Sequence, residues 1–168
     1  MRGLERLTYA RLGELLTARL RISAKAVEGV LAKAEGLGIP FPEALLREGF
    51  VSEVALAALV AEEFNLPLLP VGAVQPDREA LASLPGDFLL RHLLVPLDRF
   101  GGSLTVSMPA LAPAPILQEA KERSGLDIFP GVGFPGENRR FLEDLFKPPS
   151  LEVEESGDGR PPAPRARR

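Results

Sequence analysis

Few residues in this 168-residue sequence have the types and the spacing that catalysis requires. There is no cysteine and only one histidine, His92, which excludes a thiol nucleophile and a site built from several histidine ligands. The sequence also lacks the G-x-x-x-x-G-K-[ST] loop, which holds nucleotide phosphates with backbone amides and a lysine. We therefore predict no catalytic residue, no metal site and no cofactor, and we expect that the chain is not an enzyme.

A glycine-rich run, GVGFPG at residues 131–136, has the spacing of a dinucleotide-binding fingerprint. However, Pro135 removes an amide that would face the pyrophosphate, and no longer βαβ pattern surrounds the run. We therefore interpret Gly131, Gly133 and Gly136 as parts of a loop. His92 has no serine or cysteine nucleophile near it in the sequence, and we interpret it as a structural residue.

The composition describes a protein with a core and without strong charge. Hydrophobic residues make up 45% of the chain, and the net charge of −3 argues against a dedicated nucleic-acid-binding protein. No run of about 18 apolar residues could cross a membrane, and the first residues lack the core of a signal peptide. We expect a cytoplasmic protein that does not insert directly into a membrane.

The N-terminal third contains a repeat, because the segments 11–34 and 40–63 follow the same helix, turn, helix pattern. Five of 24 aligned positions are identical, and most other apolar positions stay apolar. Five identities could arise by chance between similar helices, but the shared turn and the shared apolar register favour a duplication. The identical pairs are Glu14/Glu43, Leu16/Leu45, Ser23/Ser52, Ala26/Ala55 and Ala32/Ala61.

Each copy breaks before a serine, and we predict Ser23 and Ser52 as N-caps of the second helices. Gly49 suits the left-handed end of a helix, whereas Leu20 at the matching position does not. The two turns should therefore differ. Helices this short are unstable alone, so we expect the four to pack on each other.

The rest of the chain predicts a small α/β unit. The alternation at Ser103–Met108, after a loop containing two glycines, predicts a hairpin. Pro96 in the preceding strand predicts either a sheet edge or a strand end. The predicted elements are an extended segment near 66–71, helices near 76–84 and 86–93, strands at 94–97 and 103–108, a helix at 113–124, a strand at 126–129 and a helix at 137–146.

These patterns predict an α+β fold in three parts. Residues 1–66 would form a helical bundle from the tandem repeat, and residues 67–146 a small α/β subdomain with a sheet of two or three strands. Residues 147–168, with an acidic run followed by a basic, proline-rich run, predict a disordered tail or a shortened linker.

The order of several motifs resembles the N-terminal region of the ATPases of type II secretion and type IV pilus assembly. The motifs are RLGELL at 11–16, NLPLLPV at 65–71 and LLRHLLVPLDRFGGSLTVSMP at 89–109. The resemblance covers residues 8–146. It implies a non-catalytic docking or regulatory module that binds a cytoplasmic or inner-membrane protein of such a machine, and so lies at the periphery of that membrane.

The resemblance also implies an alternative function, because some members of that family bind cyclic di-GMP with the paired motifs. Carried over to this sequence, the ligand-contacting residues would be Arg11, Leu12 and Gly13. An arginine can stack on guanine and pair with phosphate.

The second copy departs from that ligand-binding pattern. Pro40, Phe41 and Pro42 stand where the family has its arginine, leucine and glycine, and Glu63 stands at the closing glutamine. In the first copy Ala34 replaces that glutamine. The loss of one cation and the gain of a carboxylate predict a retained scaffold that has lost most of its ligand contacts.

Overall fold

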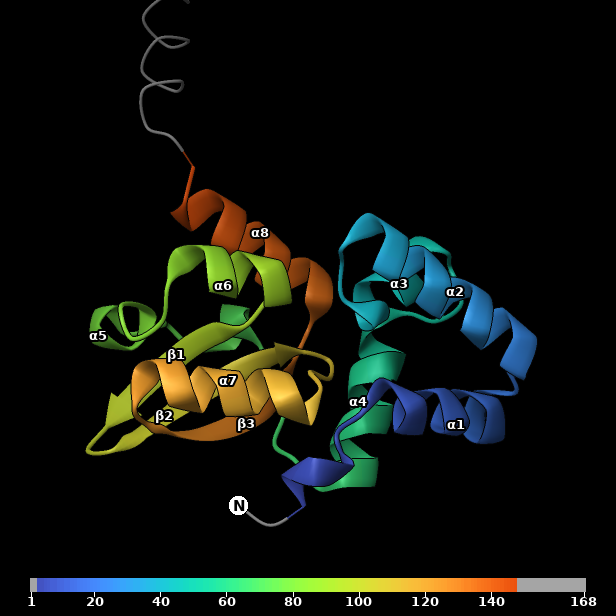
Figure 1. Cartoon of the computed structure of the whole chain (residues 1–168), viewed down its shortest axis with the longest axis horizontal. Helices are drawn as coiled ribbons and strands as arrows, with labels where there is room; N and C mark the ends of the chain where they lie inside the picture. The colour runs from blue at the N-terminus through green and yellow to red at the C-terminus, as the bar shows by residue number, and fades with distance from the viewer. Residues whose placement is uncertain (1–2, 148–168) are drawn as a thin grey trace, which may run out of the picture.

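The computed structural model describes residues 3–147, which form eight α-helices, two short 3₁₀ helices and a three-stranded sheet (Figure 1). The expected tail falls almost entirely outside these residues. In chain order the elements are η1 (Leu4–Arg6), α1 (Tyr9–Leu20), α2 (Ala24–Leu37), α3 (Phe41–Arg47), α4 (Glu53–Phe64), η2 (Val71–Ala73), α5 (Arg78–Leu81), α6 (Gly86–His92), β1 (Val95–Phe100), β2 (Ser103–Pro109), α7 (Ala114–Ser124), β3 (Asp127–Gly133) and α8 (Pro135–Leu145). The predicted α+β class is confirmed.

The tandem repeat forms two helix pairs, α1 with α2 and α3 with α4. The hydroxyl groups of Ser23 and Ser52 each accept a hydrogen bond from a backbone amide three residues later, both at 3.1 Å. These bonds satisfy donors that the first turn of a helix leaves free. The predicted N-caps are therefore confirmed in both copies.

The two turns of the repeat differ, as expected. Gly49 is left-handed, with φ 78°, and follows the seven-residue helix α3. In the first copy α1 continues through Leu20, and Arg21 takes the left-handed conformation with φ 60°. The longer first helix moves the left-handed position from Leu20 to Arg21.

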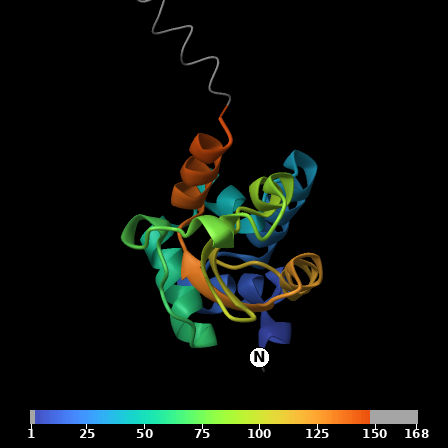
Figure 2. The same ribbon diagram turned by 90° about the vertical axis from the view of Figure 1, so that its left-hand side faces the viewer.

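The sheet has the order β1-β2-β3, with β1 antiparallel to β2 and β3 parallel to β2. The chain crosses from β2 to β3 through α7, and Figure 2 shows α7 and α8 on different sides of the sheet. Pro96 lies in the edge strand β1, beside an irregularity in the pairing. The edge position, one of the two alternatives predicted from this proline, is confirmed.

The loop predicted for the glycine-rich run is wrong. Gly131 and Gly133 belong to β3, and Gly136 lies in the first turn of α8. A methyl group at Gly131 would overlap the side chain of Leu69, and one at Gly133 would overlap the Ser107 hydroxyl group. These glycines allow close packing on a strand, which the sequence pattern alone does not distinguish from a turn.

Buried side chains of both halves join in one hydrophobic core. Leu12 and Leu16 in the repeat, and Leu104 and Val106 in β2, are fully buried members of it. In Figure 1 the four repeat helices stand beside the sheet, and α6 and α8 lie above it. The boundary at residues 66 and 67 stays a prediction.

Candidate ligand-binding and docking site

Arg11 presents its guanidinium group at the surface of α1. The hydroxyl group of Thr8 caps this helix by accepting from the Arg11 backbone amide at 3.0 Å. The Arg11 side chain is 39% exposed and pairs with Glu14 at 3.1 Å and with Glu63 at 3.7 Å. The structure thus joins the first residue of the first copy to the last residue of the second.

Leu12 and Gly13 are buried inside the repeat. Leu12 is fully buried in the core, and a methyl group at Gly13 would lie 3.0 Å from the Val27 side chain. Gly13 therefore lets α1 and α2 approach each other closely. Of the three residues that the resemblance nominated, Arg11 alone offers a polar side chain to solvent.

Arg19 belongs to the same charged cluster, and no pattern in the sequence indicated it. Its guanidinium group donates to Glu63 at 2.7 Å and to Glu62 at 3.4 Å. The partners are more than 40 residues apart in the chain, so no local spacing could reveal the pairing. We call Arg11, Arg19, Glu62 and Glu63 the α1–α4 charge cluster.

The α1–α4 charge cluster contains two cations and two carboxylates, and Arg11 also pairs with the Glu14 carboxylate. The Glu63 carboxylate lies between the guanidinium groups of Arg11 and Arg19. Most of the side chains are partly exposed, so each pair adds only a few tenths of a kcal/mol, up to about 1 kcal/mol, to stability.

Tyr9 connects the first turn of α1 to the start of α3. Its ring meets the fully buried Phe41 ring edge-on, with the centroids 5.4 Å apart. Burial raises the pKa of Tyr9 to about 12, and a hydrogen bond from the Phe41 backbone partly opposes this shift. The aromatic pair fixes the second copy against the first at its N-terminal end.

This burial predicts a loss of stability at alkaline pH. The ordinary pKa of tyrosine is 10.0, so the folded protein disfavours the phenolate, and stability falls as the pH rises from about 10 to about 12. A two-unit shift corresponds to about 2.7 kcal/mol. Tyr9 is the only tyrosine, so the ultraviolet absorbance of its phenolate reports this titration directly. A midpoint near 10 in the folded protein would contradict the prediction, and Tyr9→Phe should remove the tyrosine-dependent slope.

The helix α8 is held by carboxylates from the second copy of the repeat. Glu43, whose side chain is 7% exposed, accepts from two nitrogens of Arg139, and its bond to Arg139 Nη2 measures 2.8 Å. This hydrogen-bonded carboxylate raises the pKa of Arg139 above its ordinary value. Glu53 accepts from the Gly136 backbone amide, at the positive end of α8.

Glu43 occupies the repeat position of Glu14, yet the two carboxylates have different surroundings. The Glu14 side chain is 69% exposed and pairs within its own helix. The alignment of the copies gave no reason to expect this difference. Only the packing of α3 against α8 brings Arg139, 96 residues away, to the buried carboxylate.

The α/β half holds a buried polar contact. The Asn138 amide is fully buried and donates to the backbone oxygens of Leu93 and Ser107, at 2.9 and 3.2 Å. His92 packs edge-on against Phe88, and burial lowers its pKa, with Arg91 adding to the effect. Asn138 therefore joins α8 to the end of α6 and to β2, whereas His92 packs within α6.

Residues 3–147 hold no candidate metal site and no candidate membrane span. No cluster of three or more histidine, cysteine, aspartate or glutamate side chains is arranged to bind a metal ion in this part of the chain. Within the same residues, every helix is too short or too polar to span a membrane.

Comparisons with known proteins match this architecture. A family model for the MshEN domain matches residues 64–150. The type IV pilus assembly ATPase PilB of Myxococcus xanthus (strain DK1622) is 26% identical over 144 residues, which cover 84% of this chain and 25% of PilB. The chain thus spans about a quarter of the length of this relative.

Two solved structures share the fold. The structure of MshE with cyclic di-GMP has a TM-score of 0.59 and 20% identity, and the match covers 81% of this chain and 99% of that chain. The N-terminal domain of XpsE has a TM-score of 0.55 and 25% identity, with 80% and 93% covered. Members of this family are non-catalytic domains. Because the family match covers more than half of the sequence, this chain belongs to the MshEN domain family.

Proposed function

We propose that this chain is a docking and regulatory module of a cytoplasmic ATPase in type IV pilus assembly or type II secretion. It would bind a protein of that machine at the inner membrane and perform no catalysis itself. The similarity to PilB and to the N-terminal domain of XpsE supports this role. The observation that carries the proposal is the α1–α4 charge cluster, because Glu63 already pairs with both guanidinium groups, which opposes an open anion site.

The docking role is tested by titrating the chain with cytoplasmic domains of inner-membrane proteins from the same pilus or secretion locus. Calorimetry should detect one such domain that binds at micromolar concentration or tighter. An unrelated cytoplasmic domain of similar charge serves as the control. If none of the domains from that locus binds, the docking role is wrong.

The alternative is that the chain is a receptor for cyclic di-GMP. The bound ligand in the MshE structure and the surface position of Arg11 favour this second function. Arg11, Leu12 and Gly13 would then line the ligand site, with Arg11 and Arg19 facing the phosphates. Glu63 opposes it, because its carboxylate would repel a dianion.

We expect cyclic di-GMP to bind the natural chain weakly or not at all. Glu63→Gln should increase the affinity at least about tenfold, because about 1.4 kcal/mol of repulsion between charges is removed. Adding Arg11→Ala to this variant should abolish the gain, and Glu28→Gln, an exposed change on α2, should leave the affinity unchanged. Calorimetric titration checks all four proteins. Micromolar binding by the natural chain that Arg11→Ala abolishes would favour the receptor role over docking.

A further inference from the structure

The tip of the β1–β2 hairpin carries an exposed aromatic side chain. Phe100 is 83% exposed, and β1 changes from buried to exposed residues at Asp98. The turn that follows is the pair Gly101–Gly102, with φ 59° at Gly101. Among the described residues neither Asp98 nor Arg99 forms an ion pair, so the hairpin presents one ring beside two uncompensated charges.

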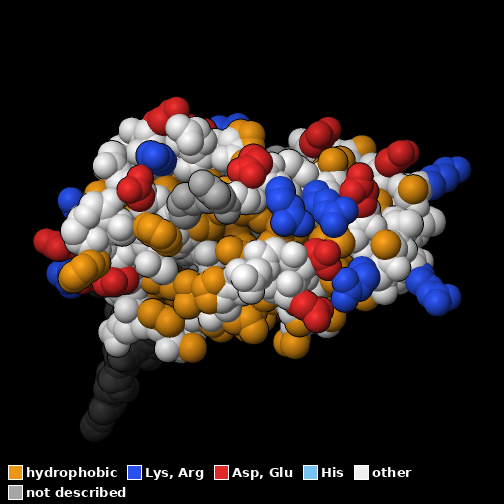
Figure 3. Space-filling view, turned by 90° about the horizontal axis from the view of Figure 1, so that it is seen from below, with side chains coloured by type: hydrophobic (Ala, Val, Ile, Leu, Met, Phe, Trp, Pro, Cys, Tyr) orange, Lys and Arg blue, Asp and Glu red, His pale blue; other side chains and the backbone are white. Residues whose placement is uncertain are grey.

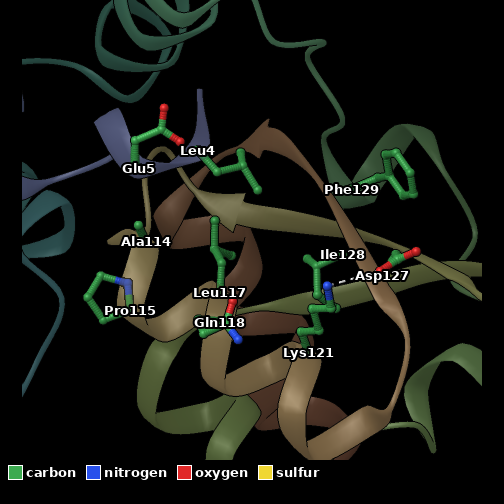
Figure 4. Close-up of a pocket in the computed structure, with 10 residues that line it drawn as sticks. All are labelled: Leu4, Glu5, Ala114, Pro115, Leu117, Gln118, Lys121, Asp127, Ile128 and Phe129. Carbon is green, nitrogen blue, oxygen red and sulfur yellow. Dashed lines mark ion pairs between the residues drawn. The ribbon is translucent and has the colours of Figure 1, made fainter. Parts of the chain in front are cut away.

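A groove of about 670 Å³ lies between η1, α7 and β3 (Figure 4). In Figure 4 the ion pair between Lys121 and Asp127, 3.3 Å apart, lies at one end, and Glu5 lies at the other. The apolar side chains that line the groove are those of Leu4, Ala114, Pro115, Leu117, Ile128 and Phe129.

The groove and the hairpin tip are neighbours on the molecule. The Asp127 amide donates to the Gly102 carbonyl oxygen at 2.9 Å, which joins the start of β3 to the hairpin turn. Figure 3 shows hydrophobic side chains gathered across the middle of the face seen from below, among acidic and basic side chains. The projecting ring and the apolar recess therefore belong to one region of the surface.

We propose that this region is a self-association surface, in which Phe100 of one copy enters the groove of a second copy. The groove is large enough for a phenyl ring, and the charges are complementary. Arg99 would approach Glu5 at one end of the groove, and Asp98 would approach Lys121 at the other. Because the projection and the groove lie side by side, a two-fold axis brings both contacts together and closes the pair.

A second copy of this chain matches this surface better than an apolar partner without charged side chains does. A single exposed ring gives a weak contact, but the two-fold arrangement forms the same contact twice. Each contact pairs the free charges of the hairpin with the charges at the ends of the groove. This association is independent of the machine partner proposed above and of the α1–α4 charge cluster.

Sedimentation velocity over a range of protein concentrations tests the proposal. The natural chain should change from monomer to dimer as its concentration rises, and Phe100→Asp should stay monomeric over the same range. Val54→Asp, at another exposed apolar position that is 68% accessible on α4, is the matched control and should dimerise as the natural chain does. Circular dichroism verifies that each variant is folded.

A complementation experiment separates this contact from other dimers. Gln118→Trp fills the groove from α7 and should also give a monomer, whereas Glu122→Trp, one turn further and outside the groove, should not. Mixing Phe100→Asp with Gln118→Trp restores one intact ring and one intact groove. The mixture should therefore dimerise, although more weakly than the natural chain.

Three results would overturn the proposal. A natural chain that stays monomeric up to its solubility limit overturns the proposal. So does a dimer that persists in both Phe100→Asp and Gln118→Trp, or a mixture of the two that stays monomeric. Binding of a machine protein is measured separately on the same variants. A failure of the self-association proposal can therefore be distinguished from a failure of the docking role.

Discussion

Gly133→Ala is expected to lower the free energy of unfolding by about 3 kcal/mol, the largest loss we expect from adding one methyl group to this protein. The new methyl group would overlap the Ser107 hydroxyl group and lie 2.9 Å from the Met108 carbonyl oxygen. The second contact is with backbone, so no side-chain rotation relieves it. Either β3 moves away from β2, or the parallel pairing at this end is lost.

Urea denaturation of Gly133→Ala and of Gly29→Ala measures the effect against a matched control. Gly29 lies inside α2, and a methyl group there meets nothing within 4 Å. Alanine is favoured over glycine in a helix by about 1 kcal/mol, so Gly29→Ala should stabilise the protein. The same chemical change thus has opposite signs at the two sites. A Gly133→Ala protein as stable as the natural chain would show that the close strand packing is not needed.

Arg139→Ala is expected to cost about 3 kcal/mol, because it leaves the Glu43 carboxylate buried without its main partner. Arg47 remains at 3.4 Å from Glu43, but it lies on the same helix and is half exposed, so it compensates only in part. Arg140→Ala is the control. Arg140 is exposed and forms no ion pair within residues 3–147, so its loss should change stability by less than about 0.5 kcal/mol.

The double variant Glu43→Leu/Arg139→Leu distinguishes two causes of lost stability, a carboxylate buried without a partner and the loss of side-chain contacts. Replacing both partners by apolar side chains removes the uncompensated carboxylate, and such replacements are often neutral. We therefore expect the double variant to recover most of the stability that Arg139→Ala loses. Chemical denaturation measures the free energy of unfolding of each variant. A double variant less stable than Arg139→Ala would refute the argument from charge burial.

The sequence by itself determined the tandem repeat and the order of nearly all elements. Capping at Ser23 and Ser52, the left-handed Gly49 and the edge position of Pro96 depend on residues close in the chain, and local backbone chemistry fixes them. The resemblance carried by ordered motifs identified the family. These are the features for which short-range physics decides the outcome.

The tertiary structure decided how the same local features are used. The sequence pattern predicted a loop at Gly131 and Gly133. In the structure both lie in β3, where a methyl group would overlap Leu69 or Ser107. The sequence suggested that Arg11 is a solvated cation, but the fold places the Glu63 carboxylate beside it. Glu14 and Glu43 are equivalent in the repeat, but only Glu43 faces α8. Burial and ion pairing depend on which distant segment packs against a residue, and no local spacing in the sequence records that choice.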